Sequence, residues 1–251
     1  IVAISGYRDN KVFIEIYDVK SGVKLTDVPV KDSSMSAVNF TTDGSKLLVH
    51  WGYDSMCVVN PQTGVILYKI GKAVDGRMLA DGSAIIVMDR YNYPVKLTMY
   101  SGANGSKIKD LSYSEQGSPT MVGLLGSSQI LFVQQSNHSS RLYAWDYNSD
   151  MKTSDITIPN PNYSNPIFSP DCSIMAVQDW NSLGVVNFYQ TVTGTKINSN
   201  PFTLPDSLNR EQSINIGVAN DKTFVAQSGG KMQSALPPTT YTISNGVIQK
   251  I

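Results

Sequence analysis

The sequence predicts an all-β fold, a β-propeller of four-stranded antiparallel blades, because it contains a repeat with propeller spacing and propeller turn residues. Six units recur along the 251 residues, and equivalent positions lie about 40 residues apart, as expected for one blade. The first half of each unit places a Gly- or Asp-containing turn before an apolar strand. In the second half, a strand runs into a polar turn and out again.

The apolar strands of the first halves predict how the blades pack. They fall within residues 40–51, 78–89, 124–135, 168–179 and 217–228. Strands that are apolar on both faces are expected where neighbouring sheets cover both sides of a sheet. No window of 12 or more residues shows a convincing helical period with caps, so helix should be nearly absent. The best helical candidate is residues 205–213, and it is one or two turns long at most.

The turn residues support the same architecture. Asp43-Gly44 and Asp81-Gly82 precede apolar strands, and Ser-Gly or Thr-Gly pairs interrupt the second halves. These residues tolerate positive φ or bond their own backbone, as tight hairpins require.

The repeat boundaries predict one propeller domain over residues 1–251 whose first blade is incomplete. The blades fall at about residues 1–30 (partial), 35–70, 71–111, 119–158, 164–204 and 213–251. The first unit contains three strands and lacks the innermost one, whereas the other five are whole. An open sheet edge is an aggregation hazard. We therefore expect an excerpt of a longer chain, or completion by a partner chain, with six or seven blades in the whole ring.

The units resemble blades of the WD40 family. The resemblance rests on the Ser-Pro-Asp turn at 169–171, the dipeptide Trp145-Asp146, and Thr-Gly turns at 63–64 and 193–194. It covers essentially the whole chain. The Gly-His dipeptide of that family is missing throughout, and Trp-Asp stands at the expected place only once. Other units have Tyr17-Asp18, Val59-Asn60, Tyr100-Ser101 and Tyr189-Gln190 there. Related propellers of the quinoprotein and peptidase-associated kinds use similar turns.

The composition favours protein partners. Apolar residues make up 41% of the chain and charged residues only 16%, with 20 basic and 20 acidic side chains. A net charge of zero argues against duplex nucleic acid or an anionic membrane surface as a partner. No stretch approaches the roughly 20 apolar residues needed to span a bilayer. We expect other proteins as partners, within a larger complex.

The cysteines favour an intracellular, cytoplasmic location, with a secreted or extracytoplasmic protein as the alternative. Cys57 and Cys172 belong to blades three apart, too far from each other for a disulfide, and unpaired thiols suit a reducing compartment. Four Asn-x-Ser/Thr sequons, at Asn39, Asn104, Asn137 and Asn162, argue the other way. Chance alone gives about three in a chain of this composition, so they carry little weight.

No motif for catalysis, cofactor binding or metal binding is found. The two histidines, His50 and His138, lie in different blades, and no Cys-x-x-Cys, His-x-x-x-His or Gly-x-Ser-x-Gly occurs. The Gly-rich stretch at residues 101–106 lies between strands and not before a helix, which argues against a phosphate loop. We therefore expect no catalytic residues, no cofactor and no metal.

The loops between the second and third strands of the blades are the candidate binding surface. They comprise residues 6–10, 50–55, 89–94, 136–141 and 179–184, and share one rim of a propeller. The predicted binding residues are Tyr7, Arg8, Trp51, Tyr53, Arg90, Tyr91, Tyr93, His138, Arg141 and Trp180. Trp, Tyr and Arg are enriched at binding hot spots. An alternative for Trp51 and Trp180, at matching repeat positions, is packing between blades.

Two functions remain open at this point. The first is a non-catalytic scaffold that binds other proteins through this loop rim. The second is the propeller part of a larger enzyme, quinoprotein-like or peptidase-like, or of an extracytoplasmic ligand-binding protein. A function inferred from fold alone is an analogy, so the site has to decide.

Overall fold

The structure of the chain is a computed structural model. It describes residues 1–9, 11–29, 35–51, 55–71, 75–89, 95–113, 115, 117, 119–136, 139–159, 166–169, 171–179, 185–198, 202–203, 213–218, 223–229, 239–244 and 247–250. These residues form two compact units, Ile1–Met121 and Val122–Ile251.

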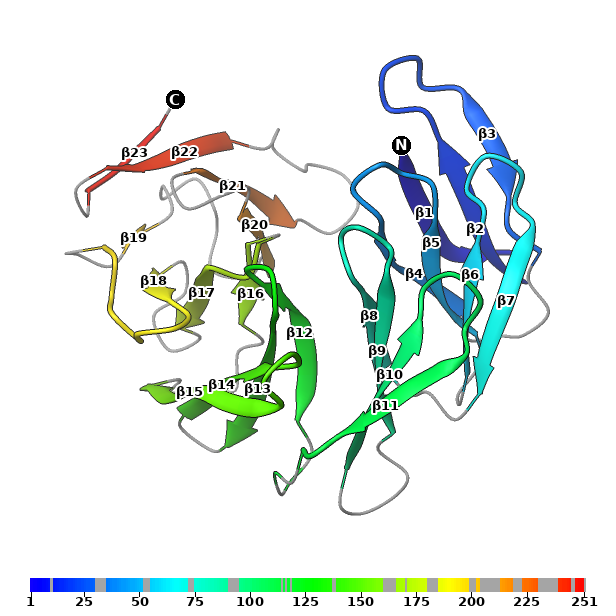
Figure 1. Cartoon of the computed structure of the whole chain (residues 1–251). Helices are drawn as coiled ribbons and strands as arrows, with labels where there is room; N and C mark the ends of the chain where they lie inside the picture. Colours follow the sequence, from blue (N-terminus) through cyan, green and yellow to red (C-terminus); the bar gives the residue numbers. More distant parts are fainter. Residues whose placement is uncertain are drawn as a thin grey trace. The chain divides into compact units, whose positions relative to one another are not determined.

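The first unit contains three antiparallel sheets (Figure 1). Its strands are β1 (Val2–Arg8), β2 (Lys11–Tyr17), β3 (Lys24–Asp27), β4 (Met35–Phe40), β5 (Leu47–Trp51), β6 (Ser55–Val59), β7 (Ile66–Gly71), β8 (Asp75–Met78), β9 (Ala84–Asp89), β10 (Lys96–Ser101) and β11 (Lys107–Leu111). The sheets are β1-β2-β3, β4-β5-β6-β7 and β8-β9-β10-β11, so each strand pairs with the next one along the chain.

The second unit repeats this arrangement in three four-stranded sheets, apart from the first residues of β12, which precede Val122. Its strands are β12 (Thr120–Leu125), β13 (Gln129–Ser136), β14 (Ser139–Asp146), β15 (Met151–Pro159), β16 (Ile167–Phe168), β17 (Ile174–Asp179), β18 (Val185–Gln190), β19 (Phe202–Thr203), β20 (Ser213–Val218), β21 (Thr223–Gly229), β22 (Thr239–Ser244) and β23 (Val247–Lys250).

The fold is an all-β propeller built from antiparallel four-stranded blades, as the repeat predicts. Among the described residues there are five four-stranded sheets and one three-stranded sheet. The three-stranded sheet is the first one, and its strands match the second, third and fourth strands of the other sheets. No helix occurs in the described part of the chain. Of the helical candidate at residues 205–213, residues 205–212 lie outside the described part, and Ser213 is the first residue of strand β20.

The hairpin between the first and second strands uses the same turn in three sheets. In Asp43-Gly44-Ser45 and Asp81-Gly82-Ser83, the Asp carboxylate accepts the N–H of the Ser at 2.9 Å. Both glycines have positive φ, 68° and 69°. The third such turn is Asp171-Cys172-Ser173, where Cys172 holds φ at 58°. This turn chemistry fixes the ends of the buried strands.

The hairpin between the third and fourth strands also recurs, and it carries a β-bulge. Gly22, Gly64, Gly105 and Gly194 have φ near 70° and donate to the carbonyl four residues earlier. After the Gly22, Gly64 and Gly105 turns, one residue of the fourth strand is skipped in the pairing register, namely Leu25, Leu67 or Ile108. Thr153 is skipped in the same way after a turn in which Asp150 has the positive φ. The bulge explains why three of these strands carry Lys-x-x-Asp ion pairs. The inserted residue brings positions three apart onto one face of the strand.

The core lies between neighbouring sheets, and the central strands are buried on both faces. On β5, Leu47 and Val49 pack toward β1-β2-β3, while Leu48 packs toward β8 and β9. In the second unit, Val133 and Leu142 pack against Met175 and Val177. This is the burial expected of strands covered on both sides.

A polar bridge ties two neighbouring sheets of the first unit together. The Asn39 side chain on β4 donates from Nδ2 to the carbonyl of Met78 at 2.8 Å, and its Oδ1 accepts the Met78 N–H at 3.1 Å. Met78 lies on β8 and is fully buried. The amide therefore satisfies the backbone of a strand in the next sheet.

Candidate functional site

Three of the predicted binding residues have described side chains, and these lie at or near the ends of the second and third strands of their sheets. Arg8 ends β1, Trp51 ends β5, and Arg141 lies near the start of β14. Tyr7 lies on β1, but its side chain is outside the described residues. The same holds for all atoms of Tyr53, Arg90, Tyr91, Tyr93, His138 and Trp180. The described side chains of this set are those of Arg8, Trp51 and Arg141.

The Arg8 side chain is bound within its own sheet. Its Nη1 donates to Glu15 Oε1 at 3.0 Å, and the guanidinium lies 4.5 Å from the centre of the Phe13 ring. The Glu15 carboxylate is nearly buried and also accepts from Lys24 Nζ at 3.1 Å and Tyr17 Oη at 2.9 Å. Hydrogen bonds from Arg8, then from Lys24 and Tyr17, lower the pKa of Glu15 to about 2. Arg8 thus neutralises an ionised carboxylate, although much of its side chain is exposed.

Trp51 lies in the core. Only 6% of its surface is exposed, and it packs in the cluster that joins β1-β2-β3 to the β4–β7 sheet. The ammonium of Lys69 lies 4.0 Å from the ring centre, a cation–π contact that covers the ring. The position of Trp51 therefore agrees with the packing alternative and leaves little of its surface for a partner.

Arg141 is also engaged by its own sheet. Its Nε and Nη2 donate to the two carboxylate oxygens of Asp155 at 2.8 and 2.5 Å, and Lys152 Nζ donates to the same carboxylate at 2.6 Å. These contacts, with Arg141 first, lower the pKa of Asp155 to about 2. The Arg141 guanidinium also lies 5.0 Å from the ring centre of Tyr143. A bidentate pair fixes the side chain in one orientation.

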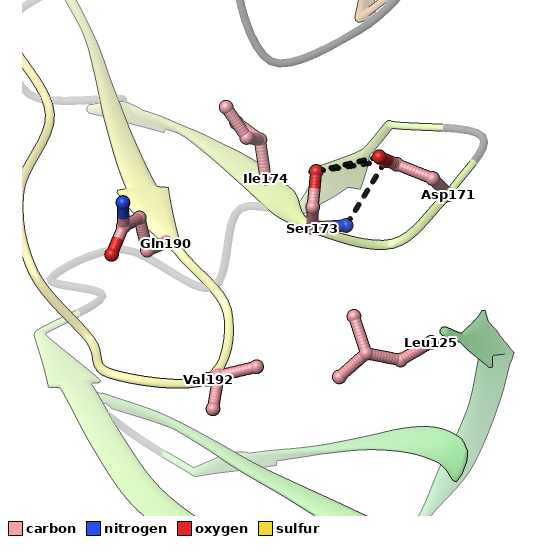
Figure 2. Close-up of a pocket in the computed structure, with 6 residues that line it drawn as sticks. All are labelled: Leu125, Asp171, Ser173, Ile174, Gln190 and Val192. Atoms are coloured by element: carbon pink, nitrogen blue, oxygen red, sulfur yellow. Dashed lines mark hydrogen bonds between the residues drawn. The ribbon is translucent and has the colours of Figure 1, made fainter. Parts of the chain in front are cut away.

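A pocket of about 400 Å³ lies in the second unit, and the sequence did not predict it (Figure 2). Its lining residues come from the ends of β12, β17 and β18 and from the turns beside them. They are Leu125, Asp171, Ser173, Ile174, Gln190 and Val192. In the β16–β19 sheet, this is the end opposite the connection between the second and third strands.

The Asp171 turn forms the polar side of this pocket. Asp171 Oδ1 accepts from Ser169 Oγ at 2.5 Å and from the Ser173 N–H at 3.1 Å. Ser173 Oγ lies 2.9 Å from both carboxylate oxygens. Burial raises the pKa of Asp171, but the bonds from Ser169 and Ser173 outweigh it, so the pKa lies below its ordinary value. The carboxylate is therefore ionised at neutral pH.

Cys172 fixes the inner side of the same turn. Its side chain is 3% exposed and packs in a cluster with Leu125, Leu131 and Ala144. A Cβ placed on Gly123 would lie 2.6 Å from the Cys172 sulfur, so a glycine there makes room for the thiol. The sequence signal for this site is the cysteine itself, because the equivalent turns have Gly44 and Gly82.

Within the described ranges, no three His, Cys, Asp or Glu side chains group closely enough to hold a metal ion. Both cysteines are buried and neither forms a disulfide, and burial raises the pKa of Cys57 to about 12, with Lys69 opposing it. Asp75 and Asp89 lie at strand ends, and Asp75 pairs with Arg77 at 2.8 Å. In the described part of the chain, no helix has the length and apolar character needed to cross a membrane.

Comparisons with known proteins support the fold. The chain resembles a chain of the mitotic checkpoint complex, with a TM-score of 0.59 and 14% identity over 100% of this chain and 74% of that one. It also resembles TolB from Acinetobacter baumannii, with a TM-score of 0.60 and 12% identity over 94% of this chain. Hydrazine synthase from Kuenenia stuttgartiensis gives a TM-score of 0.54 and 12% identity over 84% of this chain.

These similarities define a class of fold and not a particular protein. The chain spans 58% of the length of that TolB chain and 64% of the hydrazine synthase chain. No protein-family model matches the sequence, and no curated protein matches it either. At 12–14% identity, the comparisons establish the propeller architecture alone.

Proposed function

We propose that this propeller is a non-catalytic protein-interaction scaffold of the WD40-like type, which binds partners through the loops between the second and third strands. The observation that carries the proposal is the contrast between the two ends of the sheets. At one end the turns repeat the same chemistry. At the other, the connection has two residues between Arg8 and Lys11, six between Asp89 and Lys96, and nine between Gly229 and Thr239. Variable loops on a rigid scaffold are typical of recognition surfaces.

The residues available for recognition are those that the fold does not use. Trp51 is buried, and Arg8 and Arg141 have carboxylate partners in their own sheets. The loop that follows Asp89 is the most promising, because it contains Arg90, Tyr91 and Tyr93 within six residues. Aromatic and Arg side chains of this kind supply much of the energy of protein interfaces.

The test is the double variant Tyr91→Ala with Tyr93→Ala. Proteins captured from an extract of the source cells by the immobilised wild-type chain are identified by mass spectrometry, and the affinity of the main partner is measured. We expect the variant to keep its thermal unfolding temperature and to lose about 1–3 kcal/mol of binding free energy, or roughly 5- to 150-fold in Kd.

The matched control is Val65→Ala with Leu67→Ala. These two apolar side chains are 56% and 46% exposed. They lie in the neighbouring β4–β7 sheet, at the end opposite the loop between its second and third strands. The control should leave partner affinity unchanged. Equal affinities for wild type and the tyrosine variant would refute binding through this loop.

The second candidate is the propeller part of a larger enzyme or of an extracytoplasmic ligand-binding protein. It is supported by the similarity to TolB and hydrazine synthase chains that extend well beyond the matched region. In that case the chemistry would lie in another part of the polypeptide. The tyrosine variant separates the two candidates, because this second function does not require those loops to bind a protein.

A further inference from the structure

We propose that the pocket beside Asp171 binds a lysine or arginine side chain of a partner polypeptide. This inference goes beyond the proposed function, since the pocket lies at the opposite end of its sheet from the loops between the second and third strands. It would give the propeller a second recognition site with its own specificity for basic residues.

The walls of the pocket suit an alkyl chain. Leu125, Ile174 and Val192 surround the opening that Figure 2 shows between the Asp171 turn and the turn after β18. Val192 is 45% exposed, so an apolar group that covers it gains free energy by leaving water. A pocket of about 400 Å³ falls within the range of known ligand sites.

The negative charge of the pocket favours a ligand whose alkyl chain ends in a cationic group. Asp171 is the only ionisable group among the described residues that line it. Oδ1 accepts three hydrogen bonds, from Ser169 Oγ, the Ser173 N–H and Ser173 Oγ. Among the described residues, Oδ2 accepts only from Ser173 Oγ, which it shares with Oδ1. A carboxylate oxygen accommodates about two donors, so Oδ2 retains capacity for a cationic one.

The combination of wall and charge points to a basic side chain. Lysine and arginine have an apolar stem of three or four methylene groups and a charged end, and they bury the stem while the end keeps polar contacts. The carboxamide of Gln190, which accepts from Thr193 Oγ1 at 3.0 Å, adds a polar group on the β18 side. An acidic ligand is disfavoured, because the Asp171 carboxylate would repel it and no cationic side chain is among the described lining residues.

The experiment titrates the full chain with three capped pentapeptides that have arginine, lysine or norleucine at the centre and glycine elsewhere. Binding is followed through the NMR signals of the Leu125, Ile174 and Val192 methyl groups. We expect the two basic peptides to shift these signals and to bind about tenfold more tightly than the norleucine peptide. Equal affinity for norleucine, or no shift of these methyl groups, would overturn the proposal.

Two variants and a matched control test the role of the carboxylate. Asp171→Asn should weaken the arginine peptide about tenfold. Asp81→Asn changes the equivalent Asp-x-Ser turn of the first unit and should leave the affinity unchanged. Val192→Lys leaves the Asp171 turn intact and should block the peptide with a cation from the same chain. An equal loss in Asp81→Asn, or full binding by Val192→Lys, contradicts the assignment.

A final experiment distinguishes a side chain of a polypeptide from a free small-molecule cation as the ligand. Butylammonium and butylguanidinium carry the same stem and charge without a peptide backbone. We expect them to shift the same methyl groups more weakly than the peptides do. Tighter binding of the free amines than of the peptides would identify a small-molecule site and overturn the assignment to a polypeptide.

Discussion

The two ends of each sheet follow different rules. One end has the hairpins between the first and second strands and between the third and fourth. There, Asp43, Asp81 and Asp171 make the same contact with a serine two residues later. At the other end, connections vary in length from two to nine residues between the flanking strands. The turn chemistry is therefore repeated at one end of the sheets, whereas the length of the connections varies at the other end.

The pocket lies at the end of the fifth sheet where the turns are repeated, beside the one described turn of this kind that departs from the repeat. Where the β4–β7 and β8–β11 sheets have Gly44 and Gly82 at the left-handed position, the fifth sheet has Cys172, whose buried thiol packs against Leu125 and Leu131. The carboxylate of Asp171 then borders the pocket.

The largest loss of unfolding free energy is expected from an alanine substitution at a turn glycine that contacts the next sheet. Gly22 and Gly64 occupy the same turn with φ of 69° and 70°. A Cβ on Gly64 would lie 2.3 Å from the carbonyl oxygen of Asp27, whereas a Cβ on Gly22 meets nothing within 4 Å. We expect Gly64→Ala to cost about 3 kcal/mol of unfolding free energy, and Gly22→Ala only the left-handed backbone cost of about 1–2 kcal/mol.

Urea unfolding followed by far-ultraviolet circular dichroism measures both variants. The comparison between them removes the shared backbone cost, so the difference reports the contact between sheets alone. Equal costs would mean that the turn of β6–β7 does not touch β3 as closely as the structure shows.

The next effect tests the polar bridge between sheets. Asn39→Ala removes the partner of both the N–H and the carbonyl of the buried Met78, and we expect a loss of about 2 kcal/mol in unfolding free energy. The control is Asn104→Ala in the exposed β10–β11 turn, where one hydrogen bond to the Ser106 N–H is lost. It should cost about 1 kcal/mol or less in the same urea titration. A smaller loss for Asn39→Ala than for Asn104→Ala would contradict the bridge.

The sequence predicted the blades because their turns are local. The pairs Asp43-Gly44 and Asp81-Gly82 each indicate a tight turn by themselves, so the order of the strands and the missing first strand could be predicted from the sequence. The β-bulges at Leu25, Leu67 and Ile108 escaped notice, because a bulge is defined by the register with another strand.

The site was harder to predict because its contacts are not local. The sequence shows the loop positions of Arg8 and Arg141, but not that Glu15 and Asp155 on adjacent strands pair with them. Asn39 counted only as a sequon, whereas its amide nitrogen bonds a strand of the next sheet. The pocket collects residues between positions 125 and 192 and exists only after packing.

The smallest effect on stability is expected for the ion pair between Arg141, near the start of β14, and Asp155. The folded-state pKa of Asp155 is about 2 and its ordinary value is 3.8, so the pair with Arg141 stabilises the fold above pH 4. That stability is lost as the pH falls toward 2. The side chains are about a third exposed, so solvent screening limits the contribution to about 1 kcal/mol or less. Asp155→Asn should lower the unfolding temperature at pH 6 and have little effect near pH 2.

Asp110→Asn is the matched control, because Asp110 forms the same Lys-x-x-Asp pair without an arginine and is 61% exposed. It should change the unfolding temperature less at pH 6. If Asp155→Asn has no effect at either pH, Arg141 is not held by its own sheet. Its guanidinium would then be available to a partner, and Arg141 would belong with the tyrosines of the recognition loops.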